Sequence, residues 1–197
     1  EVAAAAQRFA AAAPKGTADG EHARLEALWL HQYHNAVSAD LLKQVLGSPD
    51  FRARAAAVRV LCDWRDRVPD SLELLKKAAG DEHPRVRLEA VRAASFFEVP
   101  EAAEVVFVAQ DKPADPFVDH VARETMRALD PIVKKAIADK APIKFTTAAG
   151  ARYFLKSVAT DDLLKMDRTP AVYLELLFRP GVRDEFRREA LAALAKQ

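Results

Sequence analysis

Two histidines are the first residues in this sequence whose type and spacing could support chemistry. His31 and His34 lie in the stretch from Ala27 to Val37, which reads ALWLHQYHNAV. Residues three apart on an α-helix share one face, so the two imidazoles could together bind a metal ion or a haem. The alternative is that both rings pack inside the protein. The choice depends on where the helix that carries them lies in the fold.

Other signatures of catalysis or cofactor binding are missing from the sequence. Zinc generally takes four ligands, and no cluster of His, Cys, Asp or Glu stands beside the histidine pair to complete a site. The single Cys62 lies in LCDWRD, which lacks the Cys-x-x-Cys-His motif of c-type haem attachment. Phosphate-binding loops, nucleophile elbows and His-Glu-x-x-His pairs are also missing. We therefore expect a protein that is not an enzyme and holds no cofactor and no metal.

The composition is that of a folded protein with balanced charge. The 197 residues include 30 Lys and Arg against 29 Asp and Glu, and the net charge of +1 gives no general attraction to nucleic acid. No apolar run approaches the roughly 18 residues of a membrane span. The Ala-rich opening lacks a basic region before its apolar residues, so it is expected to be a helix and not a signal peptide. Because it starts within a helical pattern, we expect a fragment of a longer protein.

Helices are expected along almost the whole chain. Apolar residues recur at three- and four-residue spacing, and Ala and Leu are abundant. Proline stands near the start of several segments, where the N–H that it lacks has no partner within the helix. The expected helices cover residues 1–13, 21–35, 39–46, 50–66, 71–79, 84–97, 100–109, 116–128, 131–139, 147–157, 160–165, 170–178 and 182–196.

Internal repetition predicts how these helices are arranged. The pentapeptides RLEAL, RAAAV, RLEAV and RREAL begin at residues 24, 54, 87 and 187. A period near 33 residues built from two short helices is typical of an α-solenoid. We predict an all-α, right-handed superhelix of about five to six helix pairs that forms a single domain over 1–197. The repeats should be regular over 21–97 and less regular over 98–197, where Pro113, Pro116, Pro131 and Pro142 interrupt the pattern.

One segment resembles the second helix of a HEAT repeat. It carries Asp81, Pro84, Val86, Arg87 and Ala90. In HEAT repeats, an Asp at the helix start and an Arg six residues later form a ladder between neighbouring repeats. The resemblance implies that Asp81 and Arg87 cap this helix and bridge to the next repeat. Arg54 holds the equivalent position one repeat earlier, but Ser48 replaces its Asp, so the ladder is incomplete there.

The alignment of the repeats also predicts the environment of the two histidines. Residue 31 shares a column with Leu61, Ala94 and Leu194, and residue 34 shares one with Trp64 and Phe97. Because these columns hold apolar side chains elsewhere, we predict that His31 and His34 are largely buried packing residues. The repeated core columns predict burial of Ala57, Val58, Leu61, Ala90, Val91 and Ala94. The aromatic residues expected in the core between repeats are Trp29, Tyr33, Trp64, Phe96 and Phe97.

Arginines at equivalent repeat positions predict a surface that binds a partner. Arg52 corresponds to Arg85 and Arg59 to Arg92, so these four should stack into a basic stripe, together with Arg65 and Arg67. Solenoids commonly bind partners along such a face. The alternative is a solvated surface whose charge is balanced locally by Asp50, Asp63, Asp66 and Glu89.

Longer strings resemble the HEAT-repeat segment of large secreted bacterial proteins. They are RLEALWLHQYHN (24–35), RVLCDWRDRVPD (59–70), DEHPRVRLEAVRAASFF (81–97), ETMRALDP (124–131) and DDLLKMDRTPAVYLELL (161–177). In that family, a sugar-dehydrogenase-like β-propeller, HEAT repeats and a c-type cytochrome domain share one polypeptide. The resemblance implies a periplasmic or secreted, non-catalytic scaffold that docks a protein partner or neighbouring domains. Neither dehydrogenase activity nor haem binding can be assigned to any residue here, because the propeller and the haem motif are missing.

A second function class is an enzyme on the same architecture. The alkylpurine DNA glycosylases built from HEAT-like repeats bind DNA through a basic concave surface. A DNA-binding surface of that kind needs an excess of positive charge for phosphate contacts, and the 29 carboxylates nearly cancel it here. We therefore expect a protein partner, no nucleic acid and no membrane insertion.

Overall fold

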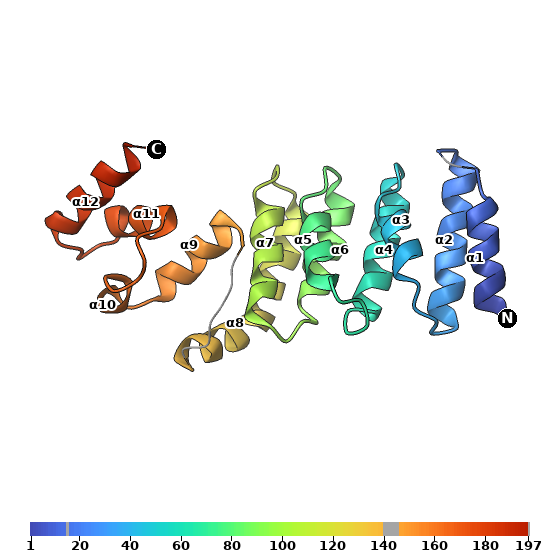
Figure 1. Cartoon of the computed structure of the whole chain (residues 1–197), viewed down its shortest axis with the longest axis horizontal. Helices are drawn as coiled ribbons and strands as arrows, with labels where there is room; N and C mark the ends of the chain where they lie inside the picture. The colour runs from blue at the N-terminus through green and yellow to red at the C-terminus, as the bar shows by residue number, and fades with distance from the viewer. Residues whose placement is uncertain (15, 140–145, 197) are drawn as a thin grey trace. The chain divides into compact units, whose positions relative to one another are not determined.

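A computed structural model describes residues 1–14, 16–139 and 146–196 (Figure 1). These residues form helices and no strand, which confirms the predicted all-α solenoid of HEAT-like helix pairs. The helices are α1 (Val2–Ala12), α2 (Ala18–Tyr33), α3 (Ala39–Leu46), α4 (Phe51–Asp63), α5 (Ser71–Ala79), α6 (Pro84–Ala94), the 3-10 helix η1 (Pro100–Ala102), α7 (Ala103–Gln110), α8 (Pro116–Ala138), α9 (Ala148–Ser157), α10 (Thr160–Leu163), α11 (Pro170–Phe178) and α12 (Asp184–Leu194).

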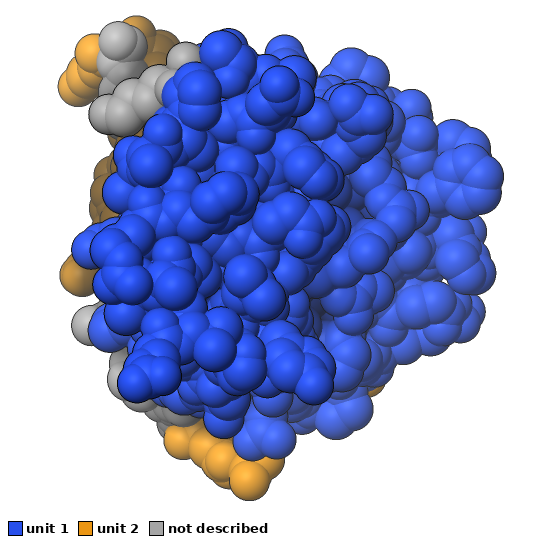
Figure 2. Space-filling view, turned by 90° about the vertical axis from the view of Figure 1, so that its right-hand side faces the viewer, with its two compact units in different colours: residues 1–132 blue, residues 133–197 orange. Residues whose placement is uncertain are grey.

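The chain divides into two compact units, Glu1–Ile132 and Val133–Gln197, which are coloured separately in Figure 2. The boundary falls one residue after Pro131, within α8. The single domain over 1–197 stays a prediction. None of the helices in the described part of the chain combines the length and the apolar character needed to cross a lipid bilayer.

Unit 1 is built from antiparallel helix pairs that stand side by side in chain order (Figure 1). In each pair, α1 packs on α2, α3 on α4 and α5 on α6. We call α2, α4, α6 and α8 the second helices of their pairs. The second helix α4 packs against both α2 and α6, so these three helices form one continuous layer. Stacking of this kind buries apolar faces that a single pair would leave in water.

The predicted core columns lie between these helices. All six residues predicted from the repeats are fully buried, each at 0% exposure: Ala57, Val58, Leu61, Ala90, Val91 and Ala94. Leu28, Leu42 and Leu75 extend the same core into the neighbouring helices. The repeat period therefore located the core correctly, because equivalent residues of successive pairs face the same neighbours.

Helix starts follow the proline and cap signals, with one correction at Pro131. The carboxylate of Asp50 accepts from the backbone N–H of Arg52 at the start of α4, and Pro84 occupies the first turn of α6. The sequence predicted separate helices at 116–128 and 131–139, but α8 runs through Pro131 without a break. Proline removes only the one hydrogen bond to the carbonyl of Arg127, and the rest of the long helix retains its own bonds. Pro142 lies outside the described residues.

Unit 2 has a separate small core formed by α9 to α12. Its buried residues are Leu155, Leu163, Val172, Leu176, Val182 and Ala190. Arg179 closes the end of α9 by donating to the carbonyls of Leu155 and Val158, and its Nε lies 2.9 Å from Glu175 Oε1. Arg187 in turn donates to the carbonyl of Arg179 at 2.9 Å. Partly buried arginines that bind main-chain carbonyls therefore fix the loops of this unit.

Candidate docking surface

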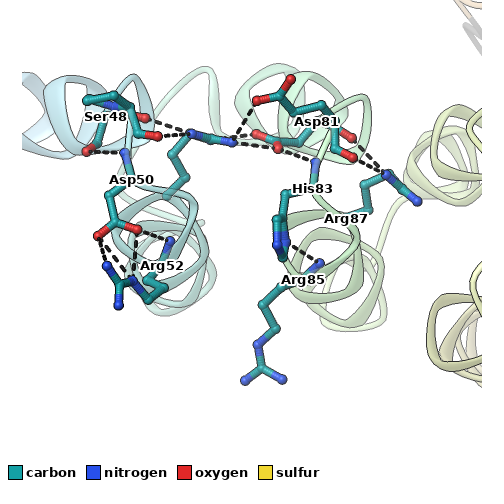
Figure 3. A network of polar contacts seen from close by, with 10 residues as sticks. Ser48, Asp50, Arg52, Asp81, His83, Arg85 and Arg87 are labelled. Carbon is teal, nitrogen blue, oxygen red and sulfur yellow. Dashed lines mark hydrogen bonds and ion pairs between the residues drawn. The ribbon is translucent and has the colours of Figure 1, made fainter.

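Arg54 of α4 forms an ion pair with Asp81 of the next repeat, and Figure 3 shows the contacts of Asp81. Arg54 Nε lies 2.7 Å from Asp81 Oδ2 and its second terminal nitrogen 2.9 Å from Asp81 Oδ1, so the pair is bidentate. The same guanidinium donates to the Ser48 carbonyl at 2.9 Å. Both partners are mostly buried, at 13% side-chain exposure. Charge-assisted bidentate bonds of this kind fix two adjacent repeats in register.

The electrostatics of the bridge favour its charged form. Burial alone would raise the pKa of Asp81, but the hydrogen bonds from Arg54 and from the His83 backbone N–H outweigh it and lower the pKa below its ordinary value. The same carboxylate raises the pKa of Arg54. The bridge is therefore ionised at neutral pH and loses its charge only in acid.

Arg87 continues the ladder through main-chain carbonyls. It is buried at 3% exposure and donates to the carbonyls of Asp81 and Glu82 at 3.1 and 2.8 Å, and to that of Pro113 at 3.1 Å. The last bond reaches the segment that precedes α8. Arg87 thus bridges to the next repeat as the resemblance implied, although its acceptors are carbonyl oxygens.

The cap of α6 is His83, and the expectation that Asp81 caps this helix is wrong. His83 Nδ1 accepts from the backbone N–H of Arg85 at 3.2 Å, while Asp81 Oδ1 accepts from the His83 N–H at 2.8 Å (Figure 3). Asp81 therefore fixes the turn before the cap. The sequence held a signal for this arrangement, because Pro84 at the first helical position places the cap on the residue before it.

The two histidines do not behave alike. His31 is buried at 6% exposure, and its Nδ1–H donates to the Ala36 carbonyl at 2.9 Å, as a packing residue would. His34 is exposed, so the prediction of burial is wrong for it. His34 follows the last residue of α2, and the backbone turns at Asn35 with φ of 53°. Its column partner Trp64 likewise follows the last residue of α4 but is buried, because α4 has second-helix neighbours on both sides.

Three of the five aromatic residues expected in the core are instead on the surface. Trp64 and Phe97 are buried, but Trp29, Tyr33 and Phe96 are 40%, 85% and 49% exposed. Trp29 shares a repeat column with Arg59 and Arg92, and Tyr33 and Phe96 share one with Asp63. Charged residues in those columns were the signal that these positions face outward. Sequence reasoning missed it because it considered the aromatic residues as a class.

A buried carboxylate contacts three arginines of the predicted basic stripe. Glu89 of α6 is 3% exposed, and its oxygens lie 2.6 Å from Arg59, 3.1 Å from Arg85 and 3.2 Å from Arg92. We call Arg59, Arg85 and Arg92 the arginine trio. Arg52 is not part of it, because its guanidinium pairs with Asp50 at 3.0 Å at the start of its own helix. The sequence named Glu89 only as a counter-charge, whereas it is the centre of the cluster.

The trio holds Glu89 in its charged form. Burial alone would raise the pKa of Glu89, but hydrogen bonds from Arg59 and Arg92 and the nearby charge of Arg85 lower it overall. The Glu89 carboxylate raises the pKa of Arg59. Three cations therefore surround one anion, and the cluster retains positive charge at its surface.

Aromatic residues flank the trio. Arg92 lies over the Phe96 ring at 5.6 Å from the centroid, and Arg65 lies over the same ring at 6.0 Å. On α2, Trp29 and Tyr33 are four residues apart, and Gln32 between them donates to Asp63 of α4. The second-helix surface, as we name it, consists of Trp29, Tyr33, Arg59, Arg85, Arg92 and Phe96. Exposed aromatics and arginines are the residue types enriched in protein interfaces.

The described residues hold no group of three or more His, Cys, Asp or Glu placed to bind a metal ion. Residues 38–127 match the family of HEAT repeats, which corresponds to the chain from α3 into α8. No curated protein and no solved structure shows significant similarity to the chain. Residues 38–127 are therefore a HEAT-repeat segment, and they contain the ladder, Glu89 and the arginine trio.

Proposed function

We propose that this chain is a non-catalytic scaffold that docks a protein partner, or neighbouring domains of its own polypeptide, on the second-helix surface. The observation that carries the proposal is the combination of exposed aromatics with an arginine trio held in place by a buried Glu89. HEAT repeats commonly mediate protein interactions, and their stacked helices present a long, rigid surface. Docking of a partner requires this surface and no catalytic group.

We extend the proposal to the context of the chain. Its strings resemble the HEAT segment of secreted bacterial proteins that combine a dehydrogenase-like propeller with a c-type cytochrome, so we propose an extracytoplasmic redox protein as the parent. Sequencing the complete reading frame tests this. An encoded propeller or a Cys-x-x-Cys-His motif would support the context, and a frame with neither would contradict it without affecting the docking proposal.

Docking is tested by site-specific photo-crosslinking. A crosslinking amino acid replaces Tyr33 on the second-helix surface, and the control replaces Lys77, which is exposed on the first helix α5. We expect a defined adduct from position 33 only, and the same partner, once purified, should bind the wild type and lose affinity for a Trp29→Ala, Tyr33→Ala variant. Equal crosslinking from both positions would overturn the assignment of the surface.

The alkylpurine glycosylase alternative is not favoured. The net charge is only +1, which provides no general attraction to the phosphates of DNA. Incubation with a duplex that carries an alkylated purine provides the check. Excision of the base would replace the scaffold proposal with an enzymatic one.

A further inference from the structure

We propose that the arginine trio and the cavity beside it bind an acidic segment of the partner that carries one bulky apolar side chain. This inference rests on the proposed docking function and specifies the chemistry of what docks. Glu89 acts as a positioning residue for the trio. The proposal follows from the unbalanced charge of the trio, from its fixed geometry and from the cavity that continues the same surface.

The trio has charge and hydrogen-bond donors to spare. Three guanidinium groups surround one carboxylate, so two positive charges are unbalanced at this point of the surface. Each guanidinium carries five N–H donors, and the contact with Glu89 occupies one nitrogen of each. The side chains of Arg59, Arg85 and Arg92 are about half exposed. The remaining donors therefore face solvent, where a second carboxylate can accept from them.

Glu89 reduces the cost of binding because it fixes the arginines in advance. A free arginine side chain loses rotamer freedom when it binds a ligand, and this loss weakens affinity. Here each guanidinium is already tied to a carboxylate that is 3% exposed and sits on the rigid helix α6. The planar guanidinium fork matches a carboxylate with two parallel N–H···O bonds. A Glu or Asp side chain of a partner is therefore a complementary ligand.

A cavity of about 510 Å³ borders the trio through Phe96 and Arg65. Its apolar walls come from Pro69, Leu72, Phe96, Phe97 and Val99. These walls suit one bulky aliphatic or aromatic side chain. Asp66 and Glu98 also line the cavity, and their negative charge repels a carboxylate from it. The ligand must therefore place its acidic groups on the trio and a single apolar group in the cavity.

Nucleic acid is the competing ligand class, because phosphates also bind arginine forks. Two observations oppose it. The carboxylates of Asp66 and Glu98 stand beside the cavity next to the trio, and the whole chain carries a net charge of only +1. A backbone with one phosphate per nucleotide would meet these carboxylates, whereas a peptide can alternate acidic and apolar residues. Nucleic acid is therefore included in the test as an outcome that contradicts the proposal.

The first experiment measures fluorescence anisotropy with the whole chain and labelled 12-residue peptides. The probe carries four consecutive Glu residues followed by Phe in an otherwise Gly-Ser sequence. One control peptide replaces Phe by Ala and another replaces the four Glu by Lys. We expect binding of the probe, about tenfold weaker binding of the Ala peptide, and none of the Lys peptide. A 20-base-pair duplex that binds more tightly than the probe would overturn the proposal.

Variants then assign the binding to the trio. Arg85→Gln removes one exposed cation and leaves Glu89 with Arg59 and Arg92, so the fold should persist. The matched control is Arg127→Gln, which removes an exposed cation of α8 that pairs with Glu124 in its own helix. Both lower the net charge by one. We expect about tenfold weaker probe binding for Arg85→Gln and unchanged binding for Arg127→Gln. Equal losses would show that only the overall charge matters and would overturn the proposal.

Glu89→Gln tests the positioning role. Simple charge attraction predicts tighter binding, because a negative charge is removed, whereas a positioned trio predicts weaker binding. Tighter binding overturns the role assigned to Glu89. If this variant does not fold, Phe96→Ala tests the cavity instead. It should weaken binding of the peptide that contains Phe and leave binding of the Ala peptide unchanged. Loss of peptide binding alone, with crosslinking from position 33 intact, would refute this inference and leave the docking function standing.

Discussion

Two arginines of the same helix have opposite roles, and the difference lies in where each side chain points. Arg52 and Arg54 are two residues apart near the start of α4. Arg52 is 78% exposed and pairs within its own turn, whereas Arg54 is 13% exposed and joins two repeats. An exposed ion pair contributes little to stability, but removal of one partner of a buried pair leaves an uncompensated charge.

Arg54→Ala should therefore destabilise the protein far more than the same substitution at Arg52. We expect a loss of about 3–5 kcal/mol in the free energy of unfolding, because Asp81 would keep its charge in a mostly buried position. The control Arg52→Ala should cost less than about 0.5 kcal/mol. Urea titration followed by circular dichroism measures both. Similar midpoints for the two variants would contradict the ladder.

The ladder also predicts how stability responds to acid. The folded state lowers the pKa of Asp81 below its unfolded value of about 4, so the bridge contributes fully above that pH and the contribution is lost as pH falls through the folded pKa. Asp81→Asn removes this dependence. We expect its free energy of unfolding to fall less steeply than that of the wild type below about pH 4. Parallel curves would show that Asp81 has the same pKa in both states.

The histidines give a third prediction at this scale. His31 binds the Ala36 carbonyl inside the protein and His34 is exposed beside Tyr33, so the two rings are not placed to share one ligand. We expect the purified chain to hold no stoichiometric metal or haem. Elemental analysis and a visible absorption spectrum provide the measurement. About one equivalent of bound metal or haem that is lost when both histidines are replaced by Ala would refute this prediction.

Among the helices, the repeat columns identify the residues that hold neighbouring pairs together. Leu61 of α4 is fully buried and faces a core that continues into α6 through Ala94. Leu61→Ala should cost about 2–5 kcal/mol, since it removes buried methyl groups and leaves a cavity. Leu191→Ala is the matched control, because Leu191 is 58% exposed on α12. A loss below about half a kcal/mol at Leu61 in urea titration would contradict the assigned helix face.

The same columns show what could be predicted from sequence and what could not. Ala57 and Leu61 were placed correctly because equivalent residues meet equivalent neighbours. His34 was misplaced because α2 has another second helix on only one side, whereas α4 has one on both sides, and the column does not record this difference. Pro131 was read as a break, although α8 continues through it. Local rules of this kind fail where tertiary packing decides the outcome.

The docking site was only partly visible in the sequence for a similar reason. Spacing revealed that Arg59 and Arg92 are equivalent and lie on one side of the array. The role of Glu89 was not visible, because a carboxylate among arginines on a helix is normally a solvated counter-charge. Its burial depends on the packing of α4 against α6, which brings Arg59 to it across 30 residues of chain. Long-range contacts of this kind have no periodic signature.

At the scale of the whole molecule, the decisive property is that the chain has two compact units with separate cores. Unit 1 is built around Leu61 and its neighbours, and unit 2 around Leu176 and Leu163. In repeat proteins, stability is a sum of local terms and nearest-neighbour interfaces, so a change in one region need not reach a distant one. The docking surface lies entirely in unit 1, and unit 2 is stabilised by its own loop-binding arginines.

This arrangement predicts that damage to one unit stays within it. Leu176→Ala should accelerate amide hydrogen exchange across residues 146–196 and leave residues 51–63 of α4 as protected as in the wild type, because the two segments belong to different cores. Leu61→Ala should accelerate exchange in residues 51–63 and leave residues 146–196 as protected as in the wild type. Exchange followed by mass spectrometry measures both variants on the whole chain. Faster exchange throughout the chain in either variant would instead support the single cooperative domain that the sequence predicted over 1–197.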